Sequence, residues 1–165
     1  MAGLSRIAVG IAELRTGGPG EVLAAVGLGS CVAVAVRDRA RLRGSLAHIM
    51  LPQQSDGLRR VGENMRKYAD VAVPEAIRAL EYIGCHRADM EAKIAGGASI
   101  FDLGRGAEGG DIGSRNVEAV IRALEEQGIL LLGSDVGGRE GRTVEFSIDT
   151  GEFSVKTVRG IRRTL

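Results

Sequence analysis

The chain has 165 residues, 44% of them hydrophobic and 26% charged, with a formal net charge of +1. This length suits one folding unit, so we expect a single domain over residues 1–165, and the composition excludes a disordered chain. The 22 basic and 21 acidic residues are interspersed along the sequence, which argues against nucleic acid as a partner.

The sequence contains neither a candidate membrane span nor an export signal. No stretch of about 18 uncharged apolar residues occurs, and the N-terminus lacks the charged, apolar and small-residue regions of a signal peptide. We therefore expect a cytoplasmic protein without membrane insertion. Its two cysteines, Cys31 and Cys85, do not make a disulfide framework in a chain of this size.

Short apolar runs rich in β-branched residues predict a chain dominated by strands. Closely spaced glycines separate many of these runs and indicate tight turns. The predicted strands span, in chain order, Ile7 to Glu13, Val22 to Leu28, Val32 to Asp38, Arg43 to Met50, Glu91 to Ile94, Ile129 to Ser134, Val144 to Ser147 and Phe153 to Thr157.

Two helices are predicted by apolar residues at three- and four-residue spacing. The first runs from about Tyr68 to Ile83 and ends at Gly84. The second runs from Ser114, as its N-cap, to Gln127 and ends at Gly128. Together with the strands, they predict an α/β (α+β) sandwich in which two main helices cover mixed β-sheets.

Three polar segments complete the chain. Gln53 to Arg66 and Phe101 to Gly113 are long enough to form loops at the rim of a site. The basic tail is expected to be a solvated chain end without a functional role. Its basic residues are Lys156, Arg159, Arg162 and Arg163.

Cys31 is a candidate nucleophile because it follows a predicted strand and two glycines, in the segment Gly27-Leu28-Gly29-Ser30-Cys31. Main-chain N–H groups near Ser30 and Cys31 can lower the pKa of a thiol there and bind an oxyanion. A buried structural cysteine fits the same residues equally well. The local sequence leaves both interpretations open.

His48 is the candidate base, in the apolar strand Ala47-His48-Ile49-Met50 that precedes Pro52. A histidine in such a strand is more often a partly buried core residue than a base. However, a cysteine and a histidine on neighbouring strands can lie within hydrogen-bond reach, which is the minimum for an activated thiolate. Cys31 and His48 therefore form a candidate catalytic pair.

Two other groups of residues, Cys85-His86 and Gly96-Gly97, are weaker candidates for a functional site. Cys85 and His86 are adjacent after a helix, and together with Cys31 and His48 they lack the ligand spacing of roughly two to five residues seen in zinc sites. The Gly96-Gly97 pair lacks the lysine of a phosphate-binding loop, so a packing turn is favoured. We expect no metal and no cofactor.

Six ordered segments resemble the CheD family of chemoreceptor glutamine deamidases and span nearly the whole chain. They are Gly27 to Val36, Ala47 to Pro52, Lys67 to Val73, Ala92 to Phe101, Ile112 to Val120 and Asp135 to Val144. The resemblance implies an enzyme that converts glutamines on the cytoplasmic helices of methyl-accepting chemotaxis receptors to glutamate, and that can also bind the phosphatase CheC. It further implies a fold similar to the cytotoxic necrotizing factor deamidase toxins.

The resemblance also implies site residues, with Cys31 as nucleophile and His48 as base. The family usually has a threonine six residues before the cysteine, as the third member of its triad, where this chain has Ala25. Another hydroxyl is therefore a candidate to orient the imidazole. The candidates are Thr16, Ser30, Ser45 and Thr143.

Further residues are candidates for lining a cleft, although glycine turns and a helix start explain them as well. These are Gly29, Gly96, Gly97, Arg115 and Asn116. Two alternatives to a deamidase remain open. One is an adaptor that docks on receptors or CheC, with weak or no catalysis because of Ala25. The other is a transglutaminase-like transfer to an amine, which begins with the same thioester.

Overall fold

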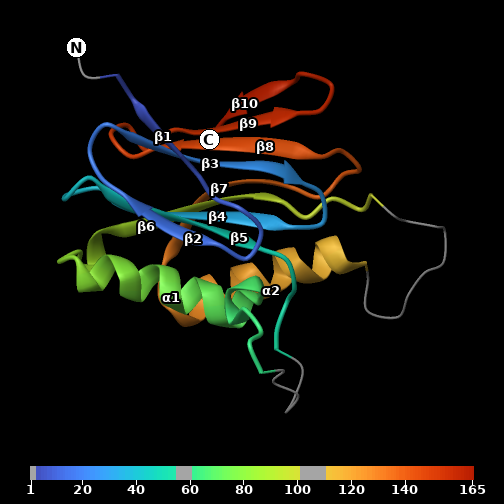
Figure 1. Ribbon diagram of the computed structural model, residues 1–165, viewed down its shortest axis with the longest axis horizontal. Coiled ribbons are helices and arrows are strands. Elements are labelled where there is room, and N and C mark those ends of the chain that lie inside the picture. Colours follow the sequence, from blue (N-terminus) through green and yellow to red (C-terminus); the bar gives the residue numbers. More distant parts are fainter. Residues whose placement is uncertain (1–2, 55–60, 101–110) are drawn as a thin grey trace.

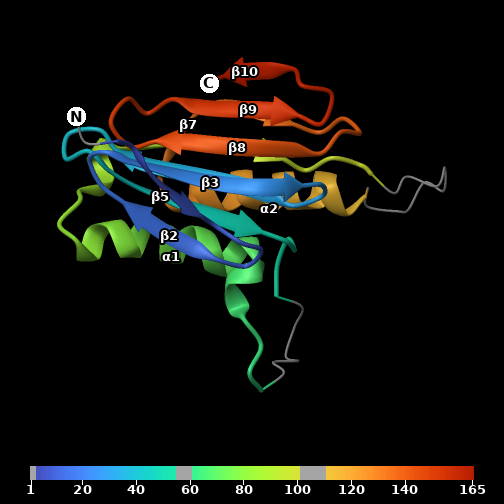
Figure 2. The same cartoon turned by 45° about the horizontal axis from the view of Figure 1, so that its top comes forward.

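The computed structural model of the chain describes residues 3–54, 61–100 and 111–165. Two five-stranded sheets lie face to face, and two helices cover the outer face of one of them (Figure 1). The turned view in Figure 2 shows both helices on the same side of the sheets. The predicted α+β sandwich of mixed sheets and two helices is thus confirmed.

Sheet A lies away from the helices and has the strand order β1-β3-β8-β9-β10. Its strands are β1 (Ser5–Ala8), β3 (Glu21–Leu28), β8 (Arg142–Ser147), β9 (Phe153–Thr157) and β10 (Arg162–Thr164). β1 and β3 are parallel, and the other neighbours are antiparallel.

Sheet B forms the middle layer and has the order β2-β5-β4-β6-β7. Its strands are β2 (Leu14–Gly17), β4 (Val32–Asp38), β5 (Arg43–Ile49), β6 (Met90–Gly96) and β7 (Leu130–Val136). β6 and β7 are parallel, so the chain between them crosses over the sheet, and α2 lies in this crossover. The other neighbours are antiparallel.

The helices are α1 (Ala69–Tyr82) and α2 (Ile112–Glu126), with short 3-10 turns η1 (Met65–Lys67) and η2 (Arg87–Asp89). Gly84 and Gly128 follow the two helices with φ of +92° and +70°, which confirms both predicted stops. The predicted N-cap of the second helix is wrong. Asp111 caps α2 instead, because its carboxylate accepts the N–H of Ser114.

Strand alternation divides the core into two apolar layers. Val32, Val34 and Val36 of β4 pack toward the helices. Ala33 and Ala35 of the same strand pack toward sheet A. Cys31 belongs to the layer between the sheets, which also contains Leu46 and Phe146.

The predicted strand from Ile7 to Glu13 is wrong in its second half. The chain leaves sheet A after Ala8 and enters sheet B at Leu14. A turn at Gly10 makes the crossing, since Glu13 both donates its N–H to the Gly10 carbonyl (3.0 Å) and accepts the Gly10 N–H on its carboxylate (2.8 Å). Val9, in the crossing segment, is buried in the layer between the sheets.

The C-terminal tail is exposed to solvent, as predicted, but part of it is paired in a strand. Residues 162–164 form β10, which pairs with β9, and the Arg163 guanidinium lies 3.4 Å from the Asp135 carboxylate. Residues 55–60 of the first predicted rim loop and residues 101–110 of the second lie outside the described residues. Among the helices that the structure describes, none is long and apolar enough to cross a membrane.

Candidate active site

Cys31 and His48 lie on neighbouring strands of sheet B. Cys31 directly precedes β4, and in the antiparallel ladder His48 of β5 pairs with Ala33. Residues two apart on a strand share a face, so Cys31 and His48 are diagonal neighbours on the face toward sheet A. The Cα atoms of such diagonal neighbours on adjacent strands are about 7–8 Å apart, a distance that an imidazole side chain can span.

Both side chains are buried and neutral at pH 7. Cys31 is 9% exposed and His48 is 1% exposed. Burial raises the pKa of the Cys31 thiol, and a hydrogen bond from its own N–H only partly offsets this. Burial lowers the pKa of His48, against smaller opposing effects of the Val9 carbonyl and Glu13. The lowered thiol pKa expected from the glycine-rich turn is therefore wrong, because desolvation outweighs the N–H donor.

The His48 ring is held by a main-chain group. Its Nδ1 lies 3.3 Å from the carbonyl oxygen of Val9. A carbonyl oxygen can only accept, so Nδ1 carries the proton and Nε2 of the neutral ring keeps its lone pair. Nε2 is buried and has no hydrogen-bond partner in the part of the chain that the structure describes. This is the tautomer that a general base requires.

Three of the hydroxyls considered as orienting groups lie elsewhere. Thr16 is exposed on β2, where it pairs with Ser45. Ser45 is buried but lies three residues before His48 on β5, so it faces the helices rather than sheet A. Thr143 precedes the core residue Val144, so its side chain lies on the outer face of sheet A.

The remaining candidate, Ser30, enters the site through its main chain. Its carbonyl accepts a hydrogen bond of 2.9 Å from the side chain of Asn116. Ala25, where the resemblance led us to expect a threonine, is buried in the same layer between the sheets as Cys31. The acceptor for His48 is therefore supplied by the Val9 carbonyl, which no motif in the sequence indicates.

The Gly96-Gly97 turn packs against the main chain of Cys31. Gly97 donates its N–H to the Cys31 carbonyl at 2.8 Å, and Ala98 donates to the Gly29 carbonyl at 2.9 Å. At Gly96, where φ is +117°, a Cβ atom would lie 2.1 Å from the Cys31 carbonyl oxygen. The predicted packing turn is confirmed, and it packs directly against the main chain of the candidate nucleophile.

The two helix residues considered for the cleft differ in position. Arg115 is exposed on α2, whereas Asn116 is fully buried beneath the Cys31 segment. Asn116 therefore does not line an open cleft. It contacts the main chain on both sides of the candidate pair, through the carbonyls of Ser30 and Met50.

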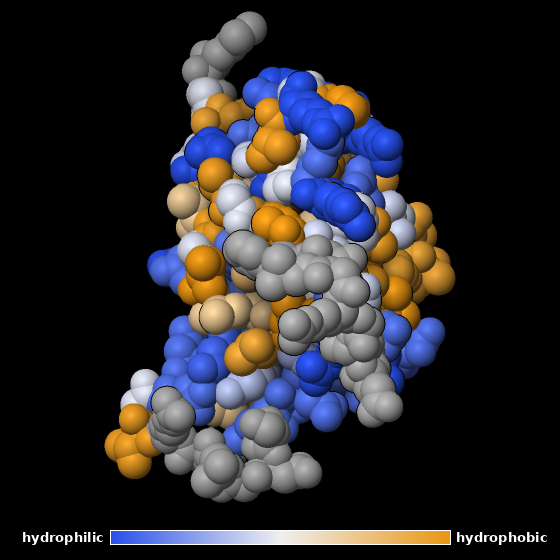
Figure 3. All heavy atoms as spheres, turned by 90° about the vertical axis from the view of Figure 1, so that its right-hand side faces the viewer, coloured by the Kyte–Doolittle hydropathy of each residue, from blue (hydrophilic) through white to orange (hydrophobic). Residues whose placement is uncertain are grey.

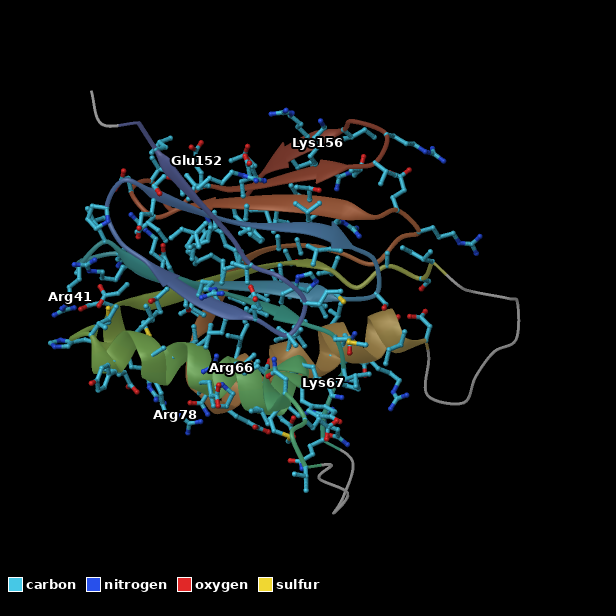
Figure 4. The ribbon with its side chains drawn as sticks, in the orientation of Figure 1. Arg41, Arg66, Lys67, Arg78, Glu152 and Lys156 are labelled. Atoms are coloured by element: carbon cyan, nitrogen blue, oxygen red, sulfur yellow. The ribbon has the colours of Figure 1, made fainter. Side chains whose placement is uncertain are left out.

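Cys85 and His86 lie at the opposite end of sheet B. The His86 N–H donates to Asp38, the last residue of β4, and the His86 ring contacts Arg41 at 2.9 Å. Figure 4 shows Arg41 at the end of the sheets away from the connection between β3 and β4. β4 has seven residues and so separates the two cysteines by roughly 20 Å, too far for a shared metal ion.

Figure 3 faces the end of the molecule at which β3 runs into β4, and hydrophilic side chains gather there over sheet A. A pocket of about 360 Å³ at this end is lined by Asp135, Arg139, Glu140, Arg142, Arg159 and Arg163, among others. Arg142 and Asp135 form a buried ion pair at 2.9 Å. Gly137 connects this pocket to the Gly96-Gly97 turn that packs against Cys31, because the Gly137 N–H donates to the Gly96 carbonyl at 3.0 Å.

Comparison with known proteins adds the family. A family model described as CheD chemotactic sensory transduction matches residues 50–157. A Clostridium kluyveri protein named probable chemoreceptor glutamine deamidase CheD is 41% identical over 155 residues, 94% of each chain. Proteins with the same name from the Hall and Langeland strains of Clostridium botulinum are 40% identical over the same shares. With two thirds of the chain inside the family model and relatives similar along nearly its full length, this chain belongs to the CheD family.

Proposed function

We propose that this chain is a cytoplasmic protein-glutamine deamidase (a glutaminase) acting on methyl-accepting chemotaxis receptors, with Cys31 as nucleophile and His48 as general base. The name of its relatives supports the reaction and the receptor substrate. The observation that carries the mechanism is the orientation of His48, whose Nδ1 contacts the Val9 carbonyl and whose Nε2 is buried with its lone pair available.

Proton transfer accompanies the attack in this mechanism, because both groups are neutral at rest. As Cys31 Sγ bonds to the carboxamide carbon of a substrate glutamine, His48 Nε2 takes the thiol proton. The amide oxygen becomes an oxyanion. The N–H of Cys31, which lies close enough to the sulfur to lower the pKa of the thiol, is the candidate donor for that charge.

His48 then returns the proton to the amide nitrogen, the carbon–nitrogen bond breaks, and ammonia leaves a thioester on Cys31. In the second half, a water molecule gives a proton to His48 as its oxygen attacks the thioester carbon. The carbon–sulfur bond breaks, the proton passes to the sulfur, and glutamate is released. Atoms and charge balance without a cofactor.

The adaptor alternative was based on the missing threonine at Ala25. The Val9 carbonyl offers His48 the acceptor that the hydroxyl would provide, so Ala25 is no reason to expect weak catalysis. A deamidase is thus favoured over an adaptor on the geometry of His48.

The test incubates a receptor cytoplasmic fragment with wild type, Cys31→Ala and, as a matched control, Cys85→Ala, in the presence of methylamine. Mass spectrometry should find a gain of about one dalton per converted glutamine with wild type and Cys85→Ala, and none with Cys31→Ala. Methylamine incorporation in place of that gain would indicate acyl transfer. Conversion by Cys31→Ala would exclude Cys31 as nucleophile, and binding without conversion by wild type would restore the adaptor.

A further inference from the structure

One buried side chain joins the two segments that carry the candidate catalytic pair. Asn116 of α2 is 0% exposed, and its Nδ2 lies 2.9 Å from the Ser30 carbonyl oxygen and 3.0 Å from the Met50 carbonyl oxygen. Ser30 directly precedes Cys31, and Met50 is two residues after His48. Because both partners are acceptors, the amide nitrogen must face them, and both of its hydrogens are used.

The bond to Ser30 determines how the peptide between Ser30 and Cys31 is turned. In a trans peptide the carbonyl and the N–H point in opposite directions, and the described residues contain no cis peptide. Asn116 holds the Ser30 carbonyl on the helix side, so the Cys31 N–H points to the opposite side, toward sheet A, where it lowers the pKa of the thiol. This N–H is the oxyanion donor of the proposed mechanism.

The bond to Met50 holds the end of β5 just beyond His48. The ladder between β4 and β5 ends at the pair Val32 and Ile49, so Cys31 and Met50 lie past its last register pair. Asn116 reaches both strands at this point. A displacement of about 1 Å between a nucleophile and its base can cost roughly 100-fold in rate.

The amide of Asn116 acts at this position as a hydrogen-bond donor. The Oδ1 of Asn116 is buried without a hydrogen-bond partner among the described residues, and such an acceptor costs stability. An apolar side chain of similar size would avoid that cost, but it would leave the carbonyls of Ser30 and Met50 without their Nδ2 donor. The two Nδ2 bonds to the catalytic segments are what an amide adds.

We infer that Asn116 is a positioning residue for the proposed deamidation, holding the Cys31 N–H and the His48 strand in their catalytic relation. The inference rests on the proposed roles of Cys31 and His48. Asn116 acts through these groups and does not itself touch the substrate, because it is fully buried.

The test uses alkylation of Cys31 by iodoacetamide at neutral pH, followed by mass spectrometry on the peptide that contains Cys31. For each protein, the alkylation rate is divided by the rate of the same protein carrying His48→Ala, which gives the dependence on His48 and cancels changes in access. We expect a ratio of at least about 10 for wild type and of less than about 2 for Asn116→Ala.

Val120→Ala is the matched control, because Val120 is buried one turn further along the same face of α2 and contacts the same core layer. It should lose stability in urea unfolding but keep the wild-type ratio. Asn116→Asp is a second variant that preserves the side-chain volume and offers at most one hydrogen, in its protonated form. Its ratio should fall between those of wild type and Asn116→Ala.

The outcomes separate this inference from the proposed function. If Asn116→Ala keeps the wild-type ratio, the positioning role is wrong and the Cys31 and His48 mechanism stands. If wild type itself shows a ratio near one, His48 is not the base, and both fail. In deamidation assays Asn116→Ala should lower kcat at least about 10-fold with KM nearly unchanged, and a loss confined to KM would contradict the role.

Discussion

The Nδ1 atom of His48 lies 3.3 Å from the main-chain carbonyl oxygen of Val9, in the segment that crosses from sheet A to sheet B. The contact selects the tautomer with a free Nε2 lone pair. Because the acceptor is a main-chain carbonyl, this contact does not require a particular side chain at position 9 or at position 25. A CheD chain can therefore orient its histidine with alanine at position 25.

Ala25→Thr is expected to change kcat by less than about threefold, because the Val9 carbonyl already orients the imidazole. The variant should lose roughly 1–3 kcal/mol in the free energy of unfolding, since Ala25 is 1% exposed and the larger side chain must fit into the core. Deamidation rates and urea unfolding check these values. A gain of tenfold or more in kcat would mean that Val9 does not replace the threonine.

The pH profile of kcat/KM should have an acid limb with its midpoint below 6.5, the ordinary pKa of histidine, since burial lowers the pKa of His48 and only the neutral ring accepts a proton. Activity should fall again only above pH 9.0, the ordinary thiol value, since burial raises the pKa of Cys31. Above that limb no proton is available for the leaving ammonia. An acid midpoint above 6.5 would contradict the neutral pair.

Stability should also depend on pH through His48. The unfolded chain binds a proton at the ordinary pKa of 6.5, whereas burial lowers the pKa in the folded state. The contribution is therefore complete above pH 6.5 and is lost as pH falls below it, by at most about 1.4 kcal/mol per pH unit. Urea unfolding of wild type and His48→Gln at about pH 5.5 and 7.5 tests this. Equal pH dependence in both proteins would refute it.

Gly96→Ala should reduce kcat at least about tenfold, because the added Cβ would lie 2.1 Å from the Cys31 carbonyl oxygen and must displace the nucleophile. Gly84→Ala is the matched control, since Gly84 also has a positive φ (+92°) but no atom within 4 Å of the Cβ position. Both variants should lose about 1 kcal/mol or more in the free energy of unfolding from backbone strain. If the two have equal kcat, the turn does not support Cys31.

Asp135→Ala is expected to lower the free energy of unfolding by about 3–5 kcal/mol, because it leaves the Arg142 guanidinium buried without its carboxylate. Both partners are 8% exposed. Arg163→Ala removes the outer contact to the same carboxylate and should cost less than about 1 kcal/mol, since Arg163 is largely exposed to solvent. Similar losses in both variants, measured by urea unfolding, would contradict a buried pair at the pocket.

Local features of the structure could be predicted from the sequence. The predicted strands at Val32–Asp38 and Phe153–Thr157 coincide with β4 and β9. Both helix ends fall at the predicted glycines, because a left-handed residue after a helix is a local requirement. The prediction failed between Ile7 and Glu13. The chain passes there from one sheet to the other, and the run of apolar residues gives no sign of the turn.

The types of the main elements, and the places of Cys31 and His48 near strand ends, could be predicted from the residues alone, because periodicity, glycine conformation and strand alternation act over a few residues. The environment of that pair depends on contacts between segments that are far apart in the chain. The partner of His48 is 39 positions away, and Asn116 is 86 and 66 positions from the two carbonyls that it holds. The pKa shifts of Cys31 and His48 follow from burial between two sheets, which depends on how distant segments pack.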